Sequence, residues 1–283
     1  MSGDFIEPVS ISGGPTEHYN TVVGAWGSLL GENLHYGYFD NAETSLFGAT
    51  EALTNEMLKA ADFRAGMLAL DIGCGTGRAA CRIASEYGVN VTGISPSEEC
   101  VTRARALAQG MGLDASADFV TGDGTQMAFD SDSFDRVWVM ESSHLMPNKH
   151  ALLQECDRVL RPGGKIVLCD IVLKQKLPLE KVIDYRDEFL LLRDVFGRAI
   201  MEPLNFYADS LRKNGLNIEV QRDISEQTFP TFEHWRKNAA ENRARVVAEL
   251  SEKDWQQFYD ACHVLEKLWR AEILGYGIVS ARR

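Results

Sequence analysis

The chain of 283 residues is 45% hydrophobic and 25% charged, a composition typical of a globular protein with a buried core. Its 29 Lys and Arg residues against 41 Asp and Glu residues give a net charge of −12, which repels polyphosphates, so nucleic acid is not expected as a partner. The sequence does not open with a basic segment followed by an apolar run, and no apolar stretch approaches the ~18 residues of a membrane span. We therefore expect a cytoplasmic protein without a membrane-spanning segment.

The cysteines are scattered along the chain, without a C-x-x-C pair or a histidine at metal-ligand spacing. They are Cys74, Cys81, Cys100, Cys156, Cys169 and Cys262. Most of them stand among apolar residues, which favours buried, reduced thiols over disulfides. No metal site is expected.

Residues 1–62 are expected to form an amino-terminal helical cover, and residues 63–283 the main domain. The cover carries two aromatic stretches, at 18–20 and 35–39, before an amphipathic helix near 50–61. In the main domain, short apolar runs alternate with helical patterns. Strands are predicted at 67–72, 89–94, 117–121, 134–140 and 165–170, and helices at 78–87 and 97–111. Strands connected by helices require crossovers, and therefore a parallel sheet with helices on both faces.

The carboxyl-terminal half departs from this alternation. A helical, charge-rich insertion at about 174–213 is placed to lie over the strand ends as a lid, and a strand follows near 217–222. Helices are predicted at 231–247 and 252–270, before a last strand at 273–280. Because these helices are rich in apolar and aromatic residues, they are candidates for packing against a second copy in a homodimer.

Several chemically distinctive residues directly follow predicted strands, and ligands of parallel sheets bind at those carboxyl ends. They are residues 73–77, Ser95, Asp123, residues 141–144 and Asp170. These side chains are expected to converge on one site.

The strongest motif is Asp71-Ile-Gly-Cys-Gly-Thr-Gly77, between a strand and a helix. Its glycines allow a tight turn and close approach to a ligand, and the free amides of the helix start favour a polar group there. The third glycine comes two residues after the second rather than three, unlike the dinucleotide fingerprint. A carboxylate at Asp71 repels a pyrophosphate but suits an ammonium group. The motif therefore indicates a nucleoside that carries an amino acid.

Five motifs in this order and spacing resemble the class I S-adenosylmethionine-dependent methyltransferases. They are Leu70-Asp-Ile-Gly-Cys-Gly-Thr-Gly77, Val91-Thr-Gly-Ile-Ser95, Val120-Thr-Gly-Asp-Gly124, Phe134-Asp-Arg-Val137 and Val159-Leu-Arg-Pro-Gly-Gly164. The resemblance implies a Rossmann-like α/β sheet of about seven strands, mostly parallel with an antiparallel last strand. Residues 35–39, 141–147 and 278–282 resemble the small-molecule group that includes the rebeccamycin sugar O-methyltransferase and the sterol, tocopherol and prenyl methyltransferases.

The resemblance also implies a cofactor site for S-adenosylmethionine, with S-adenosylhomocysteine as the product. Gly73, Gly75 and Gly77 match the positions beside the methionine part, whose ammonium group suits Asp71. Cys74 and Glu141 are further candidate cofactor-binding residues. Ile94 and Ser95 match the ribose and adenine positions, and Asp123, Gly124 and Thr125 those beside the adenine amino group. Tyr19 and Tyr36 match aromatic positions that close over the cofactor, where a ring face attracts a sulfonium.

An alcohol or phenol is a poor nucleophile until it loses its proton, so O-methylation gains from a general base at the strand ends. His144 is the best candidate because its ordinary pKa lies near neutrality. In the rebeccamycin-type enzymes a histidine and an aspartate that match His144 and Asp170 are associated with catalysis. We therefore expect O-methylation of a small secondary metabolite.

Other readings of these residues remain open. For His144 the alternative is a structural or cofactor-facing role, and for Asp170 it is the capping of a lid helix. C-methylation of a prenyl group or alkene, or N-methylation of an amine, would need little help from a base. In the prenyl case, Tyr185 and Glu188 of the insertion are candidates for steadying a cation, unless they lie on a solvated helix face. A further alternative is a cofactor-binding cyclase or scaffold without methyl transfer.

Overall fold

Seven strands form one sheet in the computed structural model, which describes residues 26–283. They are β1 (Leu68–Ile72), β2 (Asn90–Ser95), β3 (Ala117–Thr121), β4 (Phe134–Met140), β5 (Leu160–Leu173), β6 (Asn217–Asp223) and β7 (Leu274–Arg282). Their spatial order is β3-β2-β1-β4-β5-β7-β6. Strands β1 to β5 pair in parallel, whereas β7 runs antiparallel to β5 and β6. The predicted sheet is confirmed, including its antiparallel last strand.

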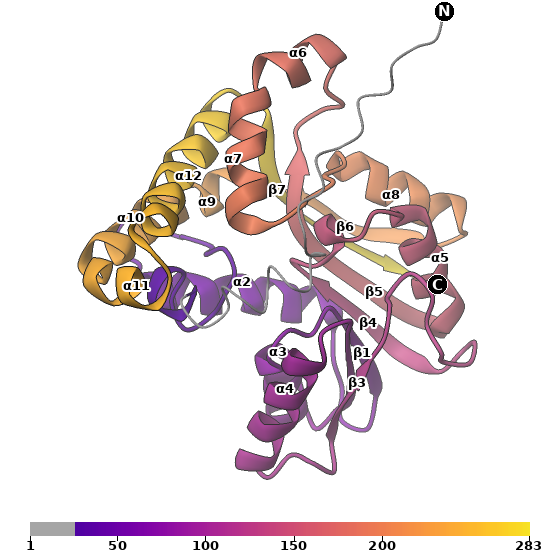
Figure 1. Cartoon of the computed structure of the whole chain (residues 1–283). Coiled ribbons are helices and arrows are strands. Elements are labelled where there is room, and N and C mark those ends of the chain that lie inside the picture. The colour runs from indigo at the N-terminus through magenta and orange to yellow at the C-terminus, as the bar shows by residue number, and fades with distance from the viewer. Residues whose placement is uncertain (1–25) are drawn as a thin grey trace, which may run out of the picture.

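Helices cover both faces of the sheet (Figure 1). Helices α2 (Leu46–Ala61), α3 (Arg78–Tyr87) and α4 (Glu98–Gly110) share one hydrophobic core with the carboxyl-terminal helices. Helices α5 (Lys149–Val159) and α8 (Leu204–Lys213) lie over the opposite face and contribute to a second core. Strand residues alternate between the two: in β1, Leu70 belongs to the second core and Ala69 to the first. The central strands of the sheet are therefore buried on both faces, as parallel strands require, whereas the edge strand β6 is largely exposed.

Local sequence explains where the helices near the strand ends begin. The Ser45 side chain accepts a hydrogen bond from the backbone of Gly48 at the start of α2. The Ser97 side chain accepts one from the backbone of Cys100 at the start of α4. Helix α3 instead begins after Gly77, whose φ of 83° is a left-handed conformation that glycine adopts readily.

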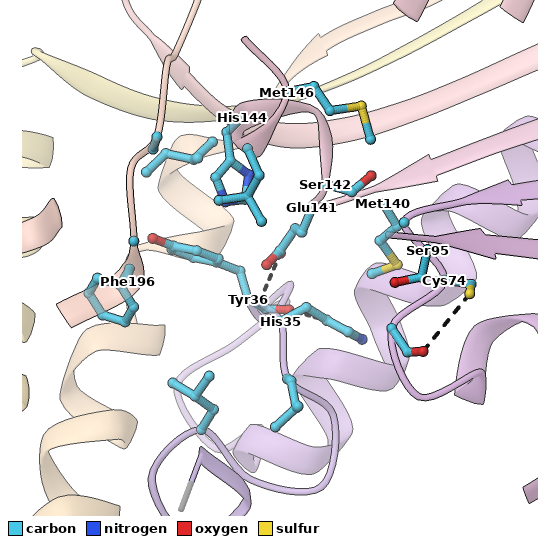
Figure 2. Close-up of a pocket in the computed structure, with 18 of the residues that line it drawn as sticks. His35, Tyr36, Cys74, Ser95, Met140, Glu141, Ser142, His144, Met146 and Phe196 are labelled. Atoms are coloured by element: carbon cyan, nitrogen blue, oxygen red, sulfur yellow. Dashed lines mark hydrogen bonds between the residues drawn. The ribbon is translucent and has the colours of Figure 1, made fainter. Parts of the chain in front are cut away.

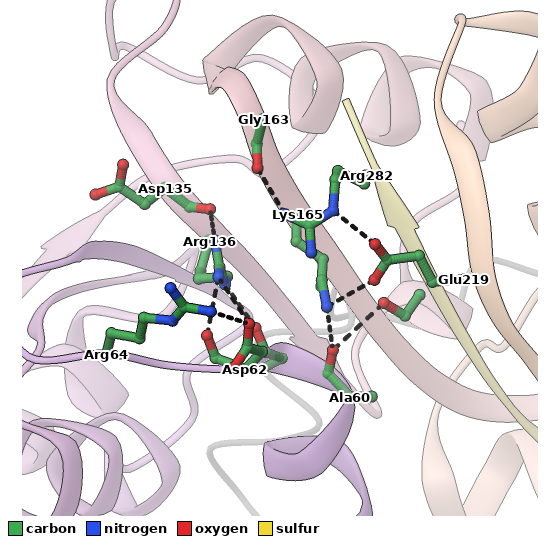
Figure 3. A network of polar contacts seen from close by, with 11 residues as sticks. Ala60, Asp62, Arg64, Asp135, Arg136, Gly163, Lys165, Glu219 and Arg282 are labelled. Carbon is green, nitrogen blue, oxygen red and sulfur yellow. Dashed lines mark hydrogen bonds and ion pairs between the residues drawn. The ribbon is translucent and has the colours of Figure 1, made fainter.

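The carboxyl end of α2 is fixed by cations from the sheet (Figure 3). Buried Arg136 donates hydrogen bonds to the carbonyl oxygens of Ala61 and Asp62, at 2.5 and 2.8 Å, and Lys165 donates to that of Ala60 at 3.1 Å. Carbonyl groups at the carboxyl end of a helix lack hydrogen-bond partners within the helix. A positive charge there supplies them and interacts favourably with the helix dipole. Because Glu219 pairs with Lys165 at 2.6 Å, the buried ammonium is itself compensated.

The insertion after β5 forms α6 (Leu179–Asp184) and α7 (Arg186–Phe196), which lie beyond the strand ends (Figure 1). Residues 204–213, which the sequence pattern grouped with this lid, form α8 and pack on the sheet, with Tyr207 and Leu211 fully buried. Of the predicted insertion, only residues 174–203 therefore stay candidates for a lid. An amphipathic pattern marks both kinds of helix alike, which is why the pattern did not separate them.

Three helices precede the last strand: α10 (Thr231–Glu241), α11 (Arg243–Glu249) and α12 (Glu252–Arg270), after the short α9 (Ser225–Thr228). The single helix predicted at 231–247 is broken at Asn242. The side-chain amide of Asn242 donates hydrogen bonds to the backbone oxygens of Ser28 and Asn238, at 3.1 and 3.0 Å. At the break, the chain thus contacts residue 28, a partner that no local pattern reveals.

Candidate active site

One large cavity lies at the carboxyl ends of the strands, with a volume of about 1460 Å³. It includes the point between β1 and β4 where the strand order reverses, the usual ligand position in such sheets. The predicted site residues that line it are Tyr36, Asp71, Gly73, Cys74, Gly75, Ser95, Asp123, Gly124, Thr125, Glu141 and His144. Gly77, Ile94 and Asp170 stand behind the lining, and Tyr19 lies outside the described residues.

The glycine loop after β1 is held against its neighbours by close backbone contacts. The backbone N–H groups of Gly73 and Cys74 both donate to the carbonyl oxygen of Ile94, at 2.9 and 3.2 Å. Gly73 has a φ of 78°, and a Cβ there would lie 2.2 Å from the Cβ of Ser142. A glycine is thus required by both backbone conformation and space. Ile94 supports the loop rather than lining the cavity.

Asp71 at the end of β1 is a buried carboxylate with an unused acceptor. Its side chain is 3% exposed, and Oδ2 has no hydrogen-bond partner among residues 26–283. Burial raises the pKa of Asp71 to about 7. An unpaired buried carboxylate is costly, so its presence beside a cavity indicates a cationic or hydrogen-bonding ligand.

The loops after β2 and β3 form another part of the cavity. Ser95 is buried, and its hydroxyl accepts a hydrogen bond from the backbone of Ser97 at 3.2 Å. Asp123 is exposed, and its Oδ1 accepts from both the backbone and the hydroxyl of Thr125, at 2.8 Å each. Gly124 packs closely enough that a Cβ would lie 2.6 Å from Ile72. The turn at 123–125 therefore has a fixed shape with one carboxylate oxygen left over.

Glu141 connects the end of β4 to the amino-terminal segment (Figure 2). Its φ is 47°, in the left-handed region, and its Oε1 accepts hydrogen bonds from the backbone of Tyr36 at 2.9 Å and the hydroxyl of Tyr276 at 2.6 Å. Burial raises the pKa of Glu141 to about 8 despite these donors. Strained backbone and a shifted carboxyl pKa are both features that concentrate at functional sites.

Tyr36 belongs to an aromatic cluster between the amino-terminal segment and the carboxyl-terminal helices. Its ring centroid lies 4.9 Å from that of Trp235 and 5.8 Å from that of Trp269, on which it stacks. Phe232 and Tyr276 complete the cluster at 5.8 and 5.2 Å. Within one chain, Tyr36 therefore packs against aromatic residues of α10, α12 and β7.

His144 and Asp170 form a hydrogen-bonded pair. His144 lies in a 3₁₀ turn, Ser143–Leu145, and its Nδ1 is 2.7 Å from Oδ1 of the fully buried Asp170. Burial opposes ionisation of both groups, but their mutual attraction outweighs it, so the pKa of His144 is raised and that of Asp170 is lowered. With Nδ1–H donated to the carboxylate, Nε2 is the ring nitrogen available to accept a proton. His144 lines the cavity, so a substrate can reach its ring (Figure 2).

The sequence predicted a lid but not which of its residues face the cavity. The apolar lining of the cavity comes largely from α7, from residues 197–202 and from β4. These residues include Trp138, Met140, Phe189, Leu192, Phe196 and Met201. In a helical pattern, residues that face a cavity look like residues that face a core. Tyr185 and Glu188 point elsewhere: Glu188 pairs with Lys267 of α12, whose ammonium is 5.7 Å from the Tyr185 ring centroid.

Other features of the described part of the chain bear on the alternatives. All six cysteines are free and buried. Within residues 26–283, no cluster of three or more His, Cys, Asp or Glu side chains is arranged to hold a metal ion. No helix in that range is long and apolar enough to cross a membrane.

Comparison with known proteins supports the family that the sequence resembles. A model of the methyltransferase domain family matches residues 70–168. The 27-O-demethylrifamycin SV methyltransferase of Amycolatopsis mediterranei is 34% identical over 267 residues, which cover 94% of this chain and 95% of that protein. The chain therefore belongs to the class I S-adenosylmethionine-dependent methyltransferases. It transfers methyl groups to small molecules, with S-adenosylmethionine as cofactor.

Enzymes whose solved structures share this fold catalyse different reactions. The mycolic acid cyclopropane synthase CmaA1, in complex with S-adenosylhomocysteine and CTAB, superposes with a TM-score of 0.85 at 17% identity and covers 95% of this chain and 96% of its own. The [4+2]-cyclase SpnF superposes with a TM-score of 0.81 at 24% identity, covering 96% and 97%. At these identities the likeness shows the fold alone, so the reaction must be argued from the site.

Proposed function

We propose that this methyltransferase methylates a hydroxyl oxygen of a largely apolar secondary metabolite, with His144 as the general base. The observation that carries this proposal is the His144–Asp170 pair, whose imidazole is open to the cavity while its carboxylate is fully buried. A base of this kind is needed for a hydroxyl and is dispensable for an amine or an alkene. The relative from Amycolatopsis mediterranei is a methyltransferase of 27-O-demethylrifamycin SV, a compound named for a missing O-methyl group, which agrees with an oxygen nucleophile.

The residues around the glycine loop fit the methionine part of the cofactor. S-Adenosylmethionine supplies an electrophilic methyl group on a sulfonium. The unpaired Oδ2 of Asp71 is proposed to accept the ammonium group, and the loop Gly73–Gly77, including Cys74 and Gly75, to lie along the methionine chain. Ser95, Asp123, Gly124 and Thr125 are proposed to bind the adenosine, because they line the same cavity beyond that loop.

The chain's own residues supply positioning and proton transfer. Glu141 holds the backbone of Tyr36, so the aromatic segment over the site is fixed to the end of β4. Asp170 orients the His144 ring, and Nε2 is proposed to take the hydroxyl proton as the oxygen attacks the methyl group. Alignment of the hydroxyl oxygen with the methyl group is proposed to supply the remainder of the rate enhancement.

The acceptor is proposed to be large and mainly apolar. The cavity of about 1460 Å³ exceeds the roughly 300–1,000 Å³ of a usual small-molecule site, which leaves room for an acceptor beside the cofactor. From the segment 174–203, the apolar side chains of Phe189, Leu192, Phe196 and Met201 line it alongside several cationic residues, Lys176, Arg186, Arg193 and Arg198. The net charge of −12 supports a small molecule over nucleic acid, and free cysteines agree with a cytoplasmic location. Homodimer formation stays a proposal.

Incubation with cofactor labelled in its methyl group tests the acceptor class. Hydroxylated polyketides and terpenoids should acquire label, whereas matched compounds with the hydroxyl blocked should not. Label on amines or alkenes instead would contradict O-methylation. A folded protein that binds S-adenosylhomocysteine but labels no compound in any pool would favour a cyclase or scaffold.

Replacing His144 by Ala should lower kcat by about 10²–10⁴-fold, the usual contribution of a general base. Because the pKa of His144 is raised, parent activity should increase with pH through a value above 6.5 and then level off. In the variant this limb should vanish. His150→Ala, an exposed histidine of α5, is the matched control and should keep the parent profile. Equal pH profiles for His144→Ala and the parent would remove the base role.

A further inference from the structure

A chain of buried hydroxyls continues the His144–Asp170 pair toward α8. The hydroxyl of Ser143 donates to Oδ2 of Asp170 at 2.5 Å, and the hydroxyl of Tyr207 lies 2.9 Å from Oγ of Ser143. Ser143, Asp170 and Tyr207 are all 0% exposed. A serine hydroxyl has one hydrogen, which is committed to the carboxylate, so Tyr207 must be the donor to Ser143. Burial also raises the pKa of Tyr207, which keeps it protonated.

Each carboxylate oxygen of Asp170 accepts two hydrogen bonds. Oδ1 accepts from Nδ1 of His144 at 2.7 Å and from the backbone of Ile171 at 2.8 Å. Oδ2 accepts from the backbone of His144 at 2.9 Å and from Ser143. Hydrogen bonds of this number keep a buried carboxylate ionised and fix its plane. Two of these four donors are backbone N–H groups and one is the His144 ring. The Ser143 hydroxyl is the fourth, and it can be removed without changing His144.

Other charged groups face this pair from the surrounding elements. Lys149 of α5 lies near Asp170, and its Nζ donates to the carbonyl oxygen of Met146 at 2.9 Å, just after the turn that carries His144. Glu141 at the end of β4 favours protonated His144, and Lys149 opposes it. Glu202 at the end of the lid acts on both Lys149 and Tyr207. None of these groups replaces the hydroxyl contact to Oδ2.

The same turn is attached to the end of the lid. The backbone N–H of Ile200 donates to the carbonyl oxygen of His144 at 2.8 Å. Tyr207 follows seven positions later, in the first turns of α8. Leu173, where the lid begins, donates its backbone N–H to Glu202 at 3.2 Å. The position of His144 therefore depends on β5 and on the segment 200–207 together.

We propose that Ser143 and Tyr207 are positioning residues for methyl transfer, which orient Asp170 and thereby hold His144 with Nε2 toward the acceptor. This inference rests on the proposed role of His144 as the base. A hydroxyl donor to Asp170 also draws negative charge away from the imidazolium. Removing it should make the carboxylate a stronger partner for protonated His144, so the pKa of His144 should rise. The Tyr207 hydroxyl acts through Ser143, so its loss should have the same sign and a smaller size.

Two variants test the proposal, Ser143→Ala and Tyr207→Phe, each with a pH profile of kcat and an NMR titration of the His144 ring. The NMR signal is assigned with His144→Gln and requires no methyl transfer. Ser143→Ala should lower kcat by roughly 10-fold, as expected for a lost hydrogen bond to a charged group. Tyr207→Phe should lower it by about 3-fold. In both, the rising limb and the NMR pKa of His144 should move upward together, while the Kd for S-adenosylhomocysteine stays at the parent value.

Two further variants separate positioning from folding. Ser280→Ala removes another fully buried hydroxyl, in β7, and should leave the profile unchanged. Ser143→Thr keeps the hydroxyl and should recover most of the activity. An unchanged His144 titration in both Ser143→Ala and Tyr207→Phe would overturn the proposal, even if kcat fell. If His144→Ala remained fully active, the base role would fail separately, while the NMR titration would still report whether the hydroxyls act on the imidazole.

Discussion

Asp71 is the residue whose burial most directly predicts a measurable property of ligand binding. Its pKa is raised to about 7 because burial disfavours the charged form. An ammonium group favours the ionised form, so binding should lower this pKa and release a proton. The affinity for S-adenosylhomocysteine should therefore increase as pH rises toward about 7 and level off above it. Isothermal titration calorimetry in buffers of different ionisation enthalpy measures both effects.

Asp71→Asn supplies the control for that prediction. The variant should bind S-adenosylhomocysteine about 10- to 100-fold more weakly, which corresponds to a lost hydrogen bond to a charged group. Its affinity should no longer depend on pH near 7. Parent-like affinity with parent-like proton release would mean that the ammonium group binds elsewhere.

For single residues, the sequence predicted those positions whose chemistry and place at a strand end both indicate a ligand site. Asp71 at the end of β1, and Glu141 and His144 after β4, line one cavity, as expected at the carboxyl ends of parallel strands. The contact between Ser143 and Tyr207 was not predicted, because nothing in a sequence brings a serine and a tyrosine 64 positions apart into contact. A hydroxyl that matters through one partner leaves no local pattern.

Among the elements, the turn that leads into α3 offers a clean test of close packing. Gly77 and Gly66 have nearly the same φ, 83° and 82°. A Cβ at Gly77 would lie 2.8 Å from both Ala104 and Phe119, whereas at Gly66 no described atom lies within 4 Å. Gly66→Ala should lower the free energy of unfolding by about 1 kcal/mol, the cost of the left-handed conformation. Gly77→Ala should cost about 1–3 kcal/mol more, because it adds overpacking.

Urea unfolding of both variants at one pH measures this difference. Equal losses would show that α4 and β3 can shift to accommodate a methyl group. The strands and α3 were predictable because their periodicity is set by burial on each face. The break at Asn242 and the packing of residues 204–213 on the sheet were not, since both involve contacts with segments distant in the sequence.

Across the whole molecule, the buried acids of the site should make the cofactor-free protein less stable at alkaline pH. The pKa values of Asp71 and Glu141 are raised to about 7 and 8, and that of His144 is raised as well. A folded pKa above the unfolded value means that stability falls as pH rises toward the folded pKa. His35, lowered to about 4, acts in the opposite sense but only below about 6.5.

The free energy of unfolding should therefore decrease by about 2 kcal/mol between pH 6.5 and 8. Urea titrations of the cofactor-free protein at the two values measure it. Glu141→Gln, which removes the acid of highest pKa, should reduce the decrease. Stability that is flat or increasing across this window would show that the two carboxyls titrate in the folded protein as ordinary surface acids do.

The placement of β7 has a consequence for how the chain is made. Residues 274–282 come after every other described element, yet β7 lies between β5 and β6 and holds Tyr276, which donates to Glu141. During synthesis the glycine loop and β1 to β5 leave the ribosome first. Strand β6 follows, but it has no strand to pair with until β7 is made. The edge of β5 stays exposed until the last of these residues is translated. Nascent chains stalled before residue 274 should thus be the form that most needs a chaperone.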